Sequence, residues 1–339
     1  MKTSSFSRHA LGLFAAIMLA GCGGAIQTST PMATEQSQSR TIRHSSSSCP
    51  CLYVANYATS GAGSVTVYPS GATGNVQPIQ DISGSNTGLR YPWDVAVDGS
   101  GDMYVANADA NTITVYAAGA TGNVAPTATI SGLNTGLDQP WGVAIDPVNG
   151  DLYAANAGVS RRITIYAPGS NGNVSPLGLI AGSKTQLHQP AGLALDPSGN
   201  IYVPNYGGDS VTIYSAGSTG NIAPSRTIEG SLTKMRDPGQ VALDSSLNIY
   251  VTTYNGNSVN VYAAGANGNV APVQRIYGGP SQLSFPWGVA VDSSDNIYAG
   301  NDYPSITVYA AGSNGKVAPI RTIKGSNTGL DYPRGIVIH

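Results

Sequence analysis

The stretch Tyr91–Asn107, YPWDVAVDGSGDMYVAN, decides the fold because two short alternating runs flank a glycine-rich turn within it. Val95–Val97 and Met103–Ala106 alternate apolar with polar or small residues, as half-buried β-strands do. Ile113–Tyr116 and Thr127–Ile130 follow in the same style, separated by Gly, Asn and Pro clusters that are typical of turns. The segment therefore predicts four consecutive antiparallel strands.

This unit recurs along the chain with a nearly constant period. The last Asp of the VAVD phrase stands at intervals of 48, 50, 48 and 48 residues, at Asp98, Asp146, Asp196, Asp244 and Asp292. Four antiparallel strands repeated at such a period are typical of the blades of a β-propeller. Second strands contain a tyrosine in six places: Tyr53, Tyr104, Tyr153, Tyr202, Tyr250 and Tyr298.

The first and last strands are offset by half a unit. Leu52–Asn56 reads as a second strand with no first strand before it, and Arg334–Ile338 reads as a first strand. We expect the two to pair and to complete blade one, because a ring closed in this way leaves no exposed blade edge. The predicted fold is an all-β, six-bladed propeller of four-stranded antiparallel blades over residues 51–339.

The residues also resemble a known repeat. Gln139–Tyr166, QPWGVAIDPVNGDLYAANAGVSRRITIY, resembles the NHL repeat, in which Pro-x-Gly-Val-Ala-Val-Asp precedes Gly-Asn-Ile-Tyr-Val-Ala-Asp. The resemblance covers all six units and implies a β-propeller, but it does not select an activity, since such relatives include lyases, metal-dependent lactonases, sensor ectodomains and RNA-binding modules. The chain departs from the repeat where its second Asp is expected, with Asn56, Asn107, Asn156, Asn205, Asn301 and, in the fifth unit, Thr253.

The N-terminal segment has the pattern of an export signal. Basic residues precede the apolar run Ala10–Ala20, and Leu-Ala-Gly-Cys ending at Cys22 resembles the lipobox of bacterial lipoproteins. The resemblance implies that residues 1–21 are a signal peptide, that Cys22 is lipidated and that the membrane is a partner. Residues 22–50, rich in Ser, Thr and Gln, are predicted to form a flexible tether. Gly23 after the cysteine favours the outer membrane, with the periplasmic or surface side left open, as is the redox state of Cys49 and Cys51.

Composition argues against one class of partner. Only 10% of the residues are charged, the formal net charge is −2, and the sixteen Lys and Arg residues are scattered rather than clustered. A nucleic-acid-binding surface needs a basic field, so no nucleic-acid partner is expected. We expect a monomeric domain whose partner is an envelope glycan, peptide or protein.

Residues that differ between blades are the candidates for a site, because a residue present in every blade is explained by the blade. The repeated Asp residues are predicted to cap their own turns, and the repeated Asn residues to hold the turn after strand two. Ten residues separate the last Ile of each fourth strand from the next Pro, and in ring order the position after that Pro holds Trp287, Arg334, Trp93, Trp141, Ala191 and Gly239.

These side chains are predicted to surround the mouth of the central channel, together with Tyr206 and Tyr254 from the loops after strand two. One position further, Asp94 and Gln240 belong to opposite blades and are expected to face each other across the channel. The alternative for the Trp residues is a purely structural role as wedges between blades. The predicted ligand-binding set is Trp93, Asp94, Trp141, Tyr206, Gln240, Tyr254, Trp287 and Arg334.

Two function classes follow from this inventory. A channel-mouth enzyme, resembling calcium-dependent lactonases, hydrolases or lyases on propellers, would draw on Asp94, Asn107 and Gln240 as candidate Ca²⁺ ligands. The chain has few other catalytic groups, since its two Glu residues lie away from the face and His188 is the one His expected there. A non-catalytic binding, scaffold or sensor module needs only the aromatic face, so it is the favoured interpretation, with no cofactor expected.

Overall fold

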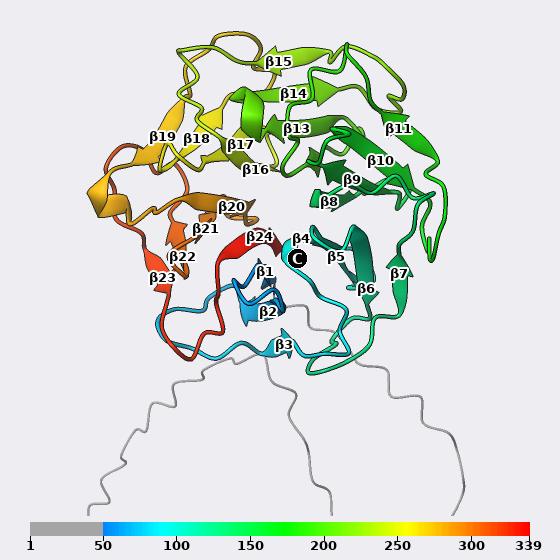
Figure 1. Cartoon of the computed structure of the whole chain (residues 1–339). Helices are drawn as coiled ribbons and strands as arrows, with labels where there is room; N and C mark the ends of the chain where they lie inside the picture. The colour runs from blue at the N-terminus through cyan, green and yellow to red at the C-terminus, as the bar shows by residue number, and fades with distance from the viewer. Residues whose placement is uncertain (1–49) are drawn as a thin grey trace, which may run out of the picture. The chain divides into compact units, whose positions relative to one another are not determined.

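The computed structural model describes residues 50–339, and the strands in this range form six four-stranded antiparallel sheets arranged as a ring (Figure 1). These residues form a compact unit of their own. The expected signal peptide, the lipidation site Cys22, Cys49 and most of the tether lie outside the described residues. In residues 50–339 no helix is long and apolar enough to cross a bilayer. The all-β six-bladed propeller is therefore confirmed.

Each blade runs from an innermost first strand to an outermost fourth strand. The strands of blades 1 to 3 are β24 (Pro333–Ile338), β1 (Cys51–Asn56), β2 (Ser64–Pro69) and β3 (Gln80–Ile82); β4 (Pro92–Val97), β5 (Met103–Asn107), β6 (Thr112–Tyr116) and β7 (Ala128–Ile130); β8 (Pro140–Ile145), β9 (Leu152–Asn156), β10 (Arg162–Tyr166) and β11 (Gly178–Ile180).

Blades 4 to 6 follow the same order and contain two short 3₁₀ turns. Their elements are β12 (Ala194–Leu195), β13 (Ile201–Asn205), η1 (Tyr206–Gly208), β14 (Ser210–Tyr214) and β15 (Arg226–Ile228); β16 (Pro238–Leu243), β17 (Ile249–Thr253), β18 (Ser258–Tyr262) and β19 (Gln274–Tyr277); η2 (Gly279–Ser281), β20 (Pro286–Val291), β21 (Ile297–Asn301), β22 (Ser305–Tyr309) and β23 (Arg321–Ile323).

The ring closes by pairing the two ends of the described chain. β24 pairs antiparallel with β1, with Leu52 opposite Ile338 and Val54 opposite Ile336. Beyond the strands, the Cys51 N–H donates to the His339 carbonyl at 2.7 Å and the His339 N–H donates back at 3.0 Å. Blade one is thus completed as the sequence predicted.

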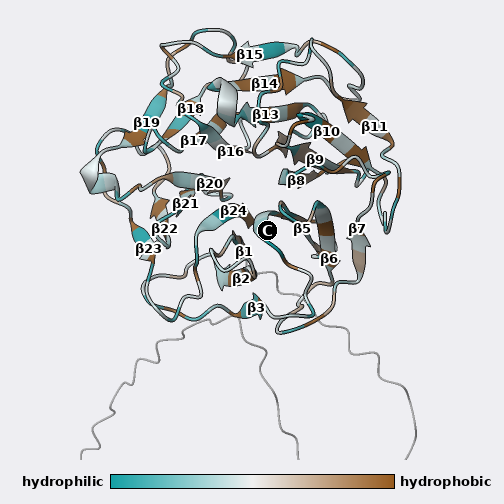
Figure 2. Ribbon diagram, viewed as in Figure 1, coloured by the Kyte–Doolittle hydropathy of each residue, from teal (hydrophilic) through white to brown (hydrophobic). Residues whose placement is uncertain are grey.

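Apolar residues from neighbouring blades pack against each other and form the core. The interface of blades 1 and 2, for example, buries Val65 and Ile82 against Val95 and Met103. Figure 2 shows the inner and middle strands as largely white and brown, whereas the outer strands β15, β19 and β23 carry hydrophilic residues. Because each strand presents successive side chains to opposite faces of its sheet, both faces of a blade contribute to the interfaces with its neighbours.

Repeated polar residues fasten each blade to its surroundings. The Tyr116 hydroxyl, at the end of β6, donates to the Thr87 carbonyl in the preceding connection at 2.5 Å, and every other third strand has an equivalent tyrosine. Asn123 in the turn between β6 and β7 accepts the Asn86 N–H of the blade before it at 2.7 Å. These bonds satisfy backbone groups in every blade, so they specify the ring rather than a ligand.

The ring has two faces that differ in chemistry. Connections between blades lie next to the loops after second strands, as the Tyr57 N–H to Tyr332 carbonyl and Tyr254 N–H to Asp237 carbonyl bonds show. We call this side the aromatic face. Since the strands are antiparallel, the turns between first and second strands lie on the opposite side, which we call the acidic face after its repeated aspartates.

Candidate functional site

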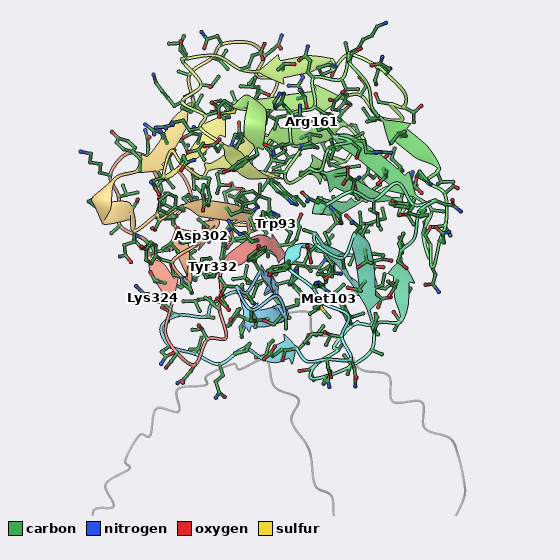
Figure 3. All side chains as sticks on the ribbon, in the orientation of Figure 1. Trp93, Met103, Arg161, Asp302, Lys324 and Tyr332 are labelled. Carbon is green, nitrogen blue, oxygen red and sulfur yellow. The ribbon has the colours of Figure 1, made fainter. Side chains whose placement is uncertain are left out.

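Three tryptophans from different blades meet over the axis on the aromatic face. Trp93 and Trp141 stack with ring centroids 4.5 Å apart and planes 2° apart. Trp287 meets both edge-on, at 5.1 Å from Trp93 and 5.7 Å from Trp141. Because Trp141 and Trp287 belong to opposite blades, their contact crosses the ring; Figure 3 shows Trp93 near its centre.

This arrangement differs from the expected ring of side chains around an open mouth. Trp287 is only 3% exposed, whereas Trp93 and Trp141 are half-buried. The three indoles close this end of the channel instead of surrounding an opening. They pack against each other across the axis, so wedging between adjacent blades does not describe them either.

A second layer of aromatic rings extends the cluster outward. Tyr206 lies 5.4 Å and Tyr254 5.7 Å from Trp287, centroid to centroid. Tyr57 lies 5.1 Å from Trp93. Two further rings continue the contacts to the rim, Tyr91 at 4.7 Å from Tyr57 and Phe285 at 5.2 Å from Tyr254. We call these eight residues the aromatic cluster: Tyr57, Tyr91, Trp93, Trp141, Tyr206, Tyr254, Phe285 and Trp287.

Arg334 is enclosed by the aromatic cluster. Its guanidinium carbon lies 4.9 Å from the Trp287 ring centroid and 5.1 Å from that of Trp93, within the range of cation–π attraction. Its Nη1 forms a 2.8 Å ion pair with Asp302 Oδ1, and both side chains are about nine-tenths buried. The Tyr254 hydroxyl donates to the other Asp302 oxygen at 2.5 Å. The cation is thus held rigidly beneath the rings.

The buried ion pair shifts the protonation of its neighbours. Burial raises the pKa of Asp302, while the positive charge of Arg334 and the hydrogen bond from Tyr254 oppose that shift. Burial and the bond to Asp302 raise the pKa of Tyr254 to about 12. The phenol therefore stays protonated at neutral pH and continues to donate.

A hollow opens beside the cluster. It has a volume of about 400 Å³ and is lined by Tyr57, Tyr91, Trp93, Trp141, Gln139 and Asp109 among others. An exposed ion pair between Asp109 and Arg90, at 2.9 Å, stands at its rim. Among residues 50–339, the Trp93 indole Nε1 and the Arg334 Nε are buried donors without an acceptor. Apolar rings and a few polar groups around a hollow are typical of a small-ligand site.

Asp94 and Gln240 lie beneath the indoles and connect across the axis, as expected from their opposite blades. Gln240 Nε2 donates to Asp94 Oδ1 at 3.0 Å. The remaining oxygens accept backbone N–H groups of other first strands: Asp94 Oδ2 from Val143 at 3.0 Å, and Gln240 Oε1 from Val289 at 2.9 Å and Ile336 at 3.2 Å. This pair ties the inner strands of five blades together.

The pair is deeply buried. Asp94 is 2% exposed, and burial raises its pKa to about 7, although backbone bonds from Val143 and Val95 act in the opposite direction. A carboxyl with this pKa is partly protonated at neutral pH.

The third calcium candidate is also engaged by the chain itself. Asn107 accepts the Arg90 N–H at 3.0 Å and donates to the Val105 carbonyl and Thr114 hydroxyl. Its side chain thus holds the connection before strand one and, through the bond to Thr114 on β6, also braces the hairpin after strand two, as predicted. The other repeated Asn residues accept from the equivalent connection, since that segment lies beside the end of strand two.

Two further expectations concern repeated Asp residues and His188. The aspartates cap their own turns as predicted; Asp196, for example, accepts the Ser198 and Asn200 N–H groups at 2.9 and 3.0 Å. His188 approaches Arg161 at 3.3 Å on the rim of the face. No group of three or more His, Cys, Asp or Glu side chains suited to a metal occurs in the part of the chain that the structure describes.

The sequence did not identify Tyr57, Tyr91, Phe285 and Asp302 as part of the site. Tyr57 and Asp302 directly follow a second strand, at the position from which Tyr206 and Tyr254 were chosen, so the same offset finds them. Tyr91 and Phe285 precede the proline of a first strand, where the backbone has φ of 49° and 48°. The equivalent residue has a φ near 50° in all six blades, so this backbone feature belongs to the repeat, and no sequence signal singled out Tyr91 and Phe285.

Comparisons with known proteins agree with the fold. A family model described as SMP-30/Gluconolactonase/LRE-like region matches residues 22–223. No curated protein matches the chain in sequence. A protein of unknown function from Bacteroides caccae superposes with a TM-score of 0.62 at 13% identity, covering 86% of this chain and 99% of that one. The nidogen/laminin complex superposes with a TM-score of 0.60 at 16% identity, covering 85% of this chain and 98% of that one. A functionally unknown protein from Desulfotomaculum acetoxidans superposes with a TM-score of 0.54 at 12% identity, covering 81% of this chain and 80% of that one.

Proposed function

The chain belongs to the SMP-30/gluconolactonase/LRE-like family, and we propose that this β-propeller is a non-catalytic binding module of the cell envelope. The observation that carries the proposal is the aromatic cluster, whose eight rings are in continuous contact across the aromatic face. Large rings with polar edges bind ligands that have flat apolar surfaces and hydroxyl groups. An uncharged envelope glycan is the ligand class with this chemistry.

The hollow supports a ligand of this kind. Half-buried rings of Tyr91, Trp93 and Trp141 line it and provide apolar surface for a sugar ring, and Gln139 and Asp109 provide polar contacts at the edge. Arg334 and Trp287 lie deeper and hold these rings in place. The charge of Arg334 is paired with Asp302, so the hollow does not call for an anionic ligand.

An enzymatic function is the alternative, because the family description includes gluconolactonase. The residues expected to hold calcium do not fit that ion. The side-chain oxygens of Asp94 and Gln240 already accept hydrogen bonds from backbone N–H groups. Asn107 is bonded within its own blade. Asp302 is neutralised by Arg334. The donor set therefore favours the binding module, with no resident cofactor.

Envelope attachment rests on the N-terminal sequence. The lipobox-like Leu-Ala-Gly-Cys ending at Cys22 supports lipidation, and Gly23 supports the outer membrane as the destination. A lipid-attached, rigid ring with one ligand-binding face is suited to a scaffold or sensor role. The periplasmic and surface sides serve this role equally.

The test is a glycan-binding screen with the purified full chain, followed by variants. Trp93→Ala and Tyr91→Ala should each weaken binding by about 1 to 3 kcal/mol, as expected for rings at the centre of a contact. Tyr303→Ala is the matched control, because this tyrosine is 68% exposed and its ring makes no contact with the cluster. Unchanged affinity in both cluster variants would refute the site.

A calcium titration on the same chain separates the two functions. The binding module predicts no tight, stoichiometric calcium binding, measured by calorimetry. One tightly bound ion per chain, lost in Asp94→Asn, would instead support the enzymatic alternative. Arg334→Lys tests the aromatic cluster instead. Lysine keeps the charge but loses the planar group that stacks on the rings, so glycan binding should weaken.

A further inference from the structure

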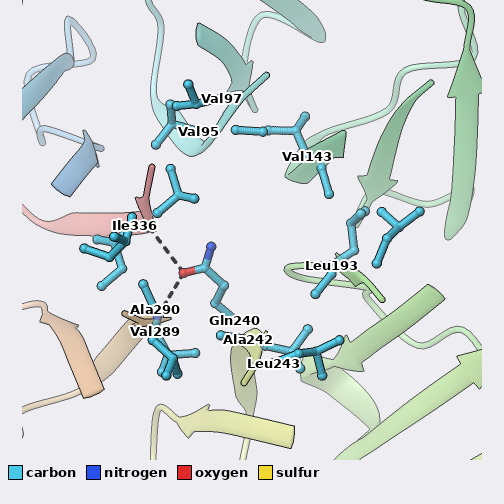
Figure 4. Close-up of a pocket in the computed structure, with 18 of the residues that line it drawn as sticks. Val95, Val97, Val143, Leu193, Gln240, Ala242, Leu243, Val289, Ala290 and Ile336 are labelled. Atoms are coloured by element: carbon cyan, nitrogen blue, oxygen red, sulfur yellow. Dashed lines mark hydrogen bonds between the residues drawn. The ribbon is translucent and has the colours of Figure 1, made fainter. Parts of the chain in front are cut away.

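The central channel is closed towards the aromatic face and forms a cavity that reaches the acidic face. Its volume is about 260 Å³, and each blade contributes three consecutive wall residues, which end with the last residue of its first strand (Figure 4). Gln240 is the one lining residue from a deeper position, so it forms the floor, with its amide directed towards Val289 and Ile336. The wall residue nearest the acidic face is partly exposed in every blade, as in Val97 and Leu195.

The walls combine aliphatic side chains with backbone acceptors. Every side chain that lines the cavity, apart from Gln240, is Ala, Val, Leu or Ile. First strands are also edge strands on the side of the axis, because each is paired on one side only. An edge strand presents backbone carbonyl and N–H groups without a strand partner. The cavity therefore contacts alkyl groups and also accepts hydrogen bonds.

The mouth of the cavity is surrounded by negative charge. In five blades the residue directly after the cavity wall is an aspartate, at Asp98, Asp146, Asp196, Asp244 and Asp292, and in the sixth it is His339. The turns that follow add Asp102, Asp151 and Asp295 and contain no Lys or Arg. The cations on this side, Arg226 and Arg321, bond to tyrosine hydroxyls rather than to the carboxylates.

Two of these carboxylates, Asp196 and Asp292, have a lowered pKa. In Asp196 and Asp292 burial alone would raise the pKa, but hydrogen bonds from the turn outweigh it, so the pKa of each lies below its ordinary value. Capping hydrogen bonds do not remove the charge. A ligand that enters the cavity must pass this ring, so a cationic group is attracted and an anionic group is repelled.

We propose that the cavity is a binding site for a protonated aliphatic amine, with its alkyl chain against the Val, Leu and Ile side chains and its ammonium group near the aspartate ring and backbone carbonyls. An apolar cavity of about 150 Å³ accepts benzene, so about 260 Å³ has room for roughly ten non-hydrogen atoms. The site is independent of the aromatic cluster, which lies on the opposite side of the Asp94–Gln240 pair.

The first test compares hexylammonium, 1-hexanol and hexanoate, which differ in head group alone, on the purified full chain by calorimetry or ligand-observed NMR. Hexylammonium should bind at one site per chain, at least tenfold more tightly than hexanoate, with 1-hexanol between them. Added salt should weaken hexylammonium binding. Equal or tighter binding of hexanoate, or no saturable binding of hexylammonium, would overturn the proposal.

Variants then place the site. Leu195→Trp fills the cavity mouth and should abolish binding, whereas Leu133→Trp, at a fully exposed position, should leave it unchanged. Asp98→Asn combined with Asp244→Asn keeps an oxygen for each turn and should weaken binding about fourfold, since one charge at roughly 8 Å in water contributes about a factor of two. Asp109→Asn, on the other face, is the matched control.

The charge variants keep the test decisive if Leu195→Trp fails to fold. Hexylammonium binding that is unaffected by the double Asp substitution, or that persists in a folded Leu195→Trp protein, would place the amine elsewhere. Trp93→Ala should not change amine binding. That result separates this site from the proposed glycan site, and failure of either leaves the other standing.

Discussion

Replacing Asp94 by Asn should change how the stability of the propeller depends on pH. Asp94 has a pKa of about 7 in the folded protein against 3.8 for the free side chain, mainly because it is buried. Between these values the folded chain holds a proton that the unfolded chain has lost. Stability therefore falls as pH rises, since the unfolded state binds fewer protons.

The size of the effect follows from the shift. Each pKa unit corresponds to about 1.4 kcal/mol, so the wild type should lose on the order of 4 kcal/mol between pH 4 and pH 8 from this one group. The contribution is fully present below pH 4 and lost above pH 7. Asn cannot titrate, so the variant lacks this pH dependence. Its side-chain NH₂ group would face the Val143 N–H, which places two donors together, so the variant should be about 1 to 3 kcal/mol less stable than the wild type at pH 4.

Urea unfolding of both proteins across this pH range measures the difference. The wild type is more stable than Asp94→Asn at pH 4, and this difference in the free energy of unfolding should shrink by about 4 kcal/mol by pH 8, so that it cancels or reverses. A change of this size corresponds to roughly 7 °C in melting temperature for a domain of this size. Asp196→Asn is the control of opposite sign, because the pKa of Asp196 is lowered and its contribution is lost as pH falls. Parallel pH profiles for wild type and Asp94→Asn would refute the reasoning.

Three other outcomes are expected. Deleting residues 332–339 removes β24 and exposes the edge of β1, so the truncated chain should aggregate or melt many degrees lower in light scattering and calorimetry; melting together with the intact chain would contradict closure. Wild-type protein should carry an acyl group by mass spectrometry and sediment with membranes, whereas Cys22→Ser should remain unprocessed, and an unmodified wild type would disprove lipidation. Tyr116→Phe should cost about 1 to 2 kcal/mol in urea unfolding because the buried Thr87 carbonyl loses its donor; Tyr303→Phe, at an exposed position, should be neutral.

The architecture was predictable because its signals are local and repeated. Alternation within Met103–Ala106 and a turn every few residues fix the strands, and the period fixes their grouping. The alternating run Val95–Val97 is only the second half of β4, which begins at Pro92, because a bulge between Pro92 and Asp94 interrupts the register and hides the beginning of the strand. Local patterns show alternation but do not show a bulge.

The membership of the candidate site was predictable only in part, and its arrangement was not. The shared position directly after the proline predicted that Trp93, Trp141, Trp287 and Arg334 lie on one face, and these side chains are in contact there. Whether six inward side chains surround an opening or close it depends on the diameter of the ring, which no local pattern encodes. The bond from the Arg90 N–H to Asn107 was not predicted for a related reason, because the arrangement of the blade brings Arg90 near.

The Asp94–Gln240 pair explains why the symmetric ring is asymmetric at its centre. The six equivalent positions are Gly288, Gly335, Asp94, Gly142, Gly192 and Gln240. A Cβ atom at Gly335 would lie 2.0 Å from Asp94 Oδ1, and one at Gly288 would lie 2.3 Å from the Arg334 carbonyl oxygen. The layer thus has room for two side chains, and glycine at the other four positions provides it.

Two side chains are also what the inner strands require. A ring of identical blades would leave the N–H groups of Val95, Val143, Val289 and Ile336 directed at the axis without partners, at a cost of about 1 to 3 kcal/mol for each buried group. One carboxyl and one carboxamide from opposite blades satisfy all four and bond to each other. By sealing the channel at this level, the same pair separates the aromatic face from the cavity on the acidic face, so the two sites that we propose can be tested independently.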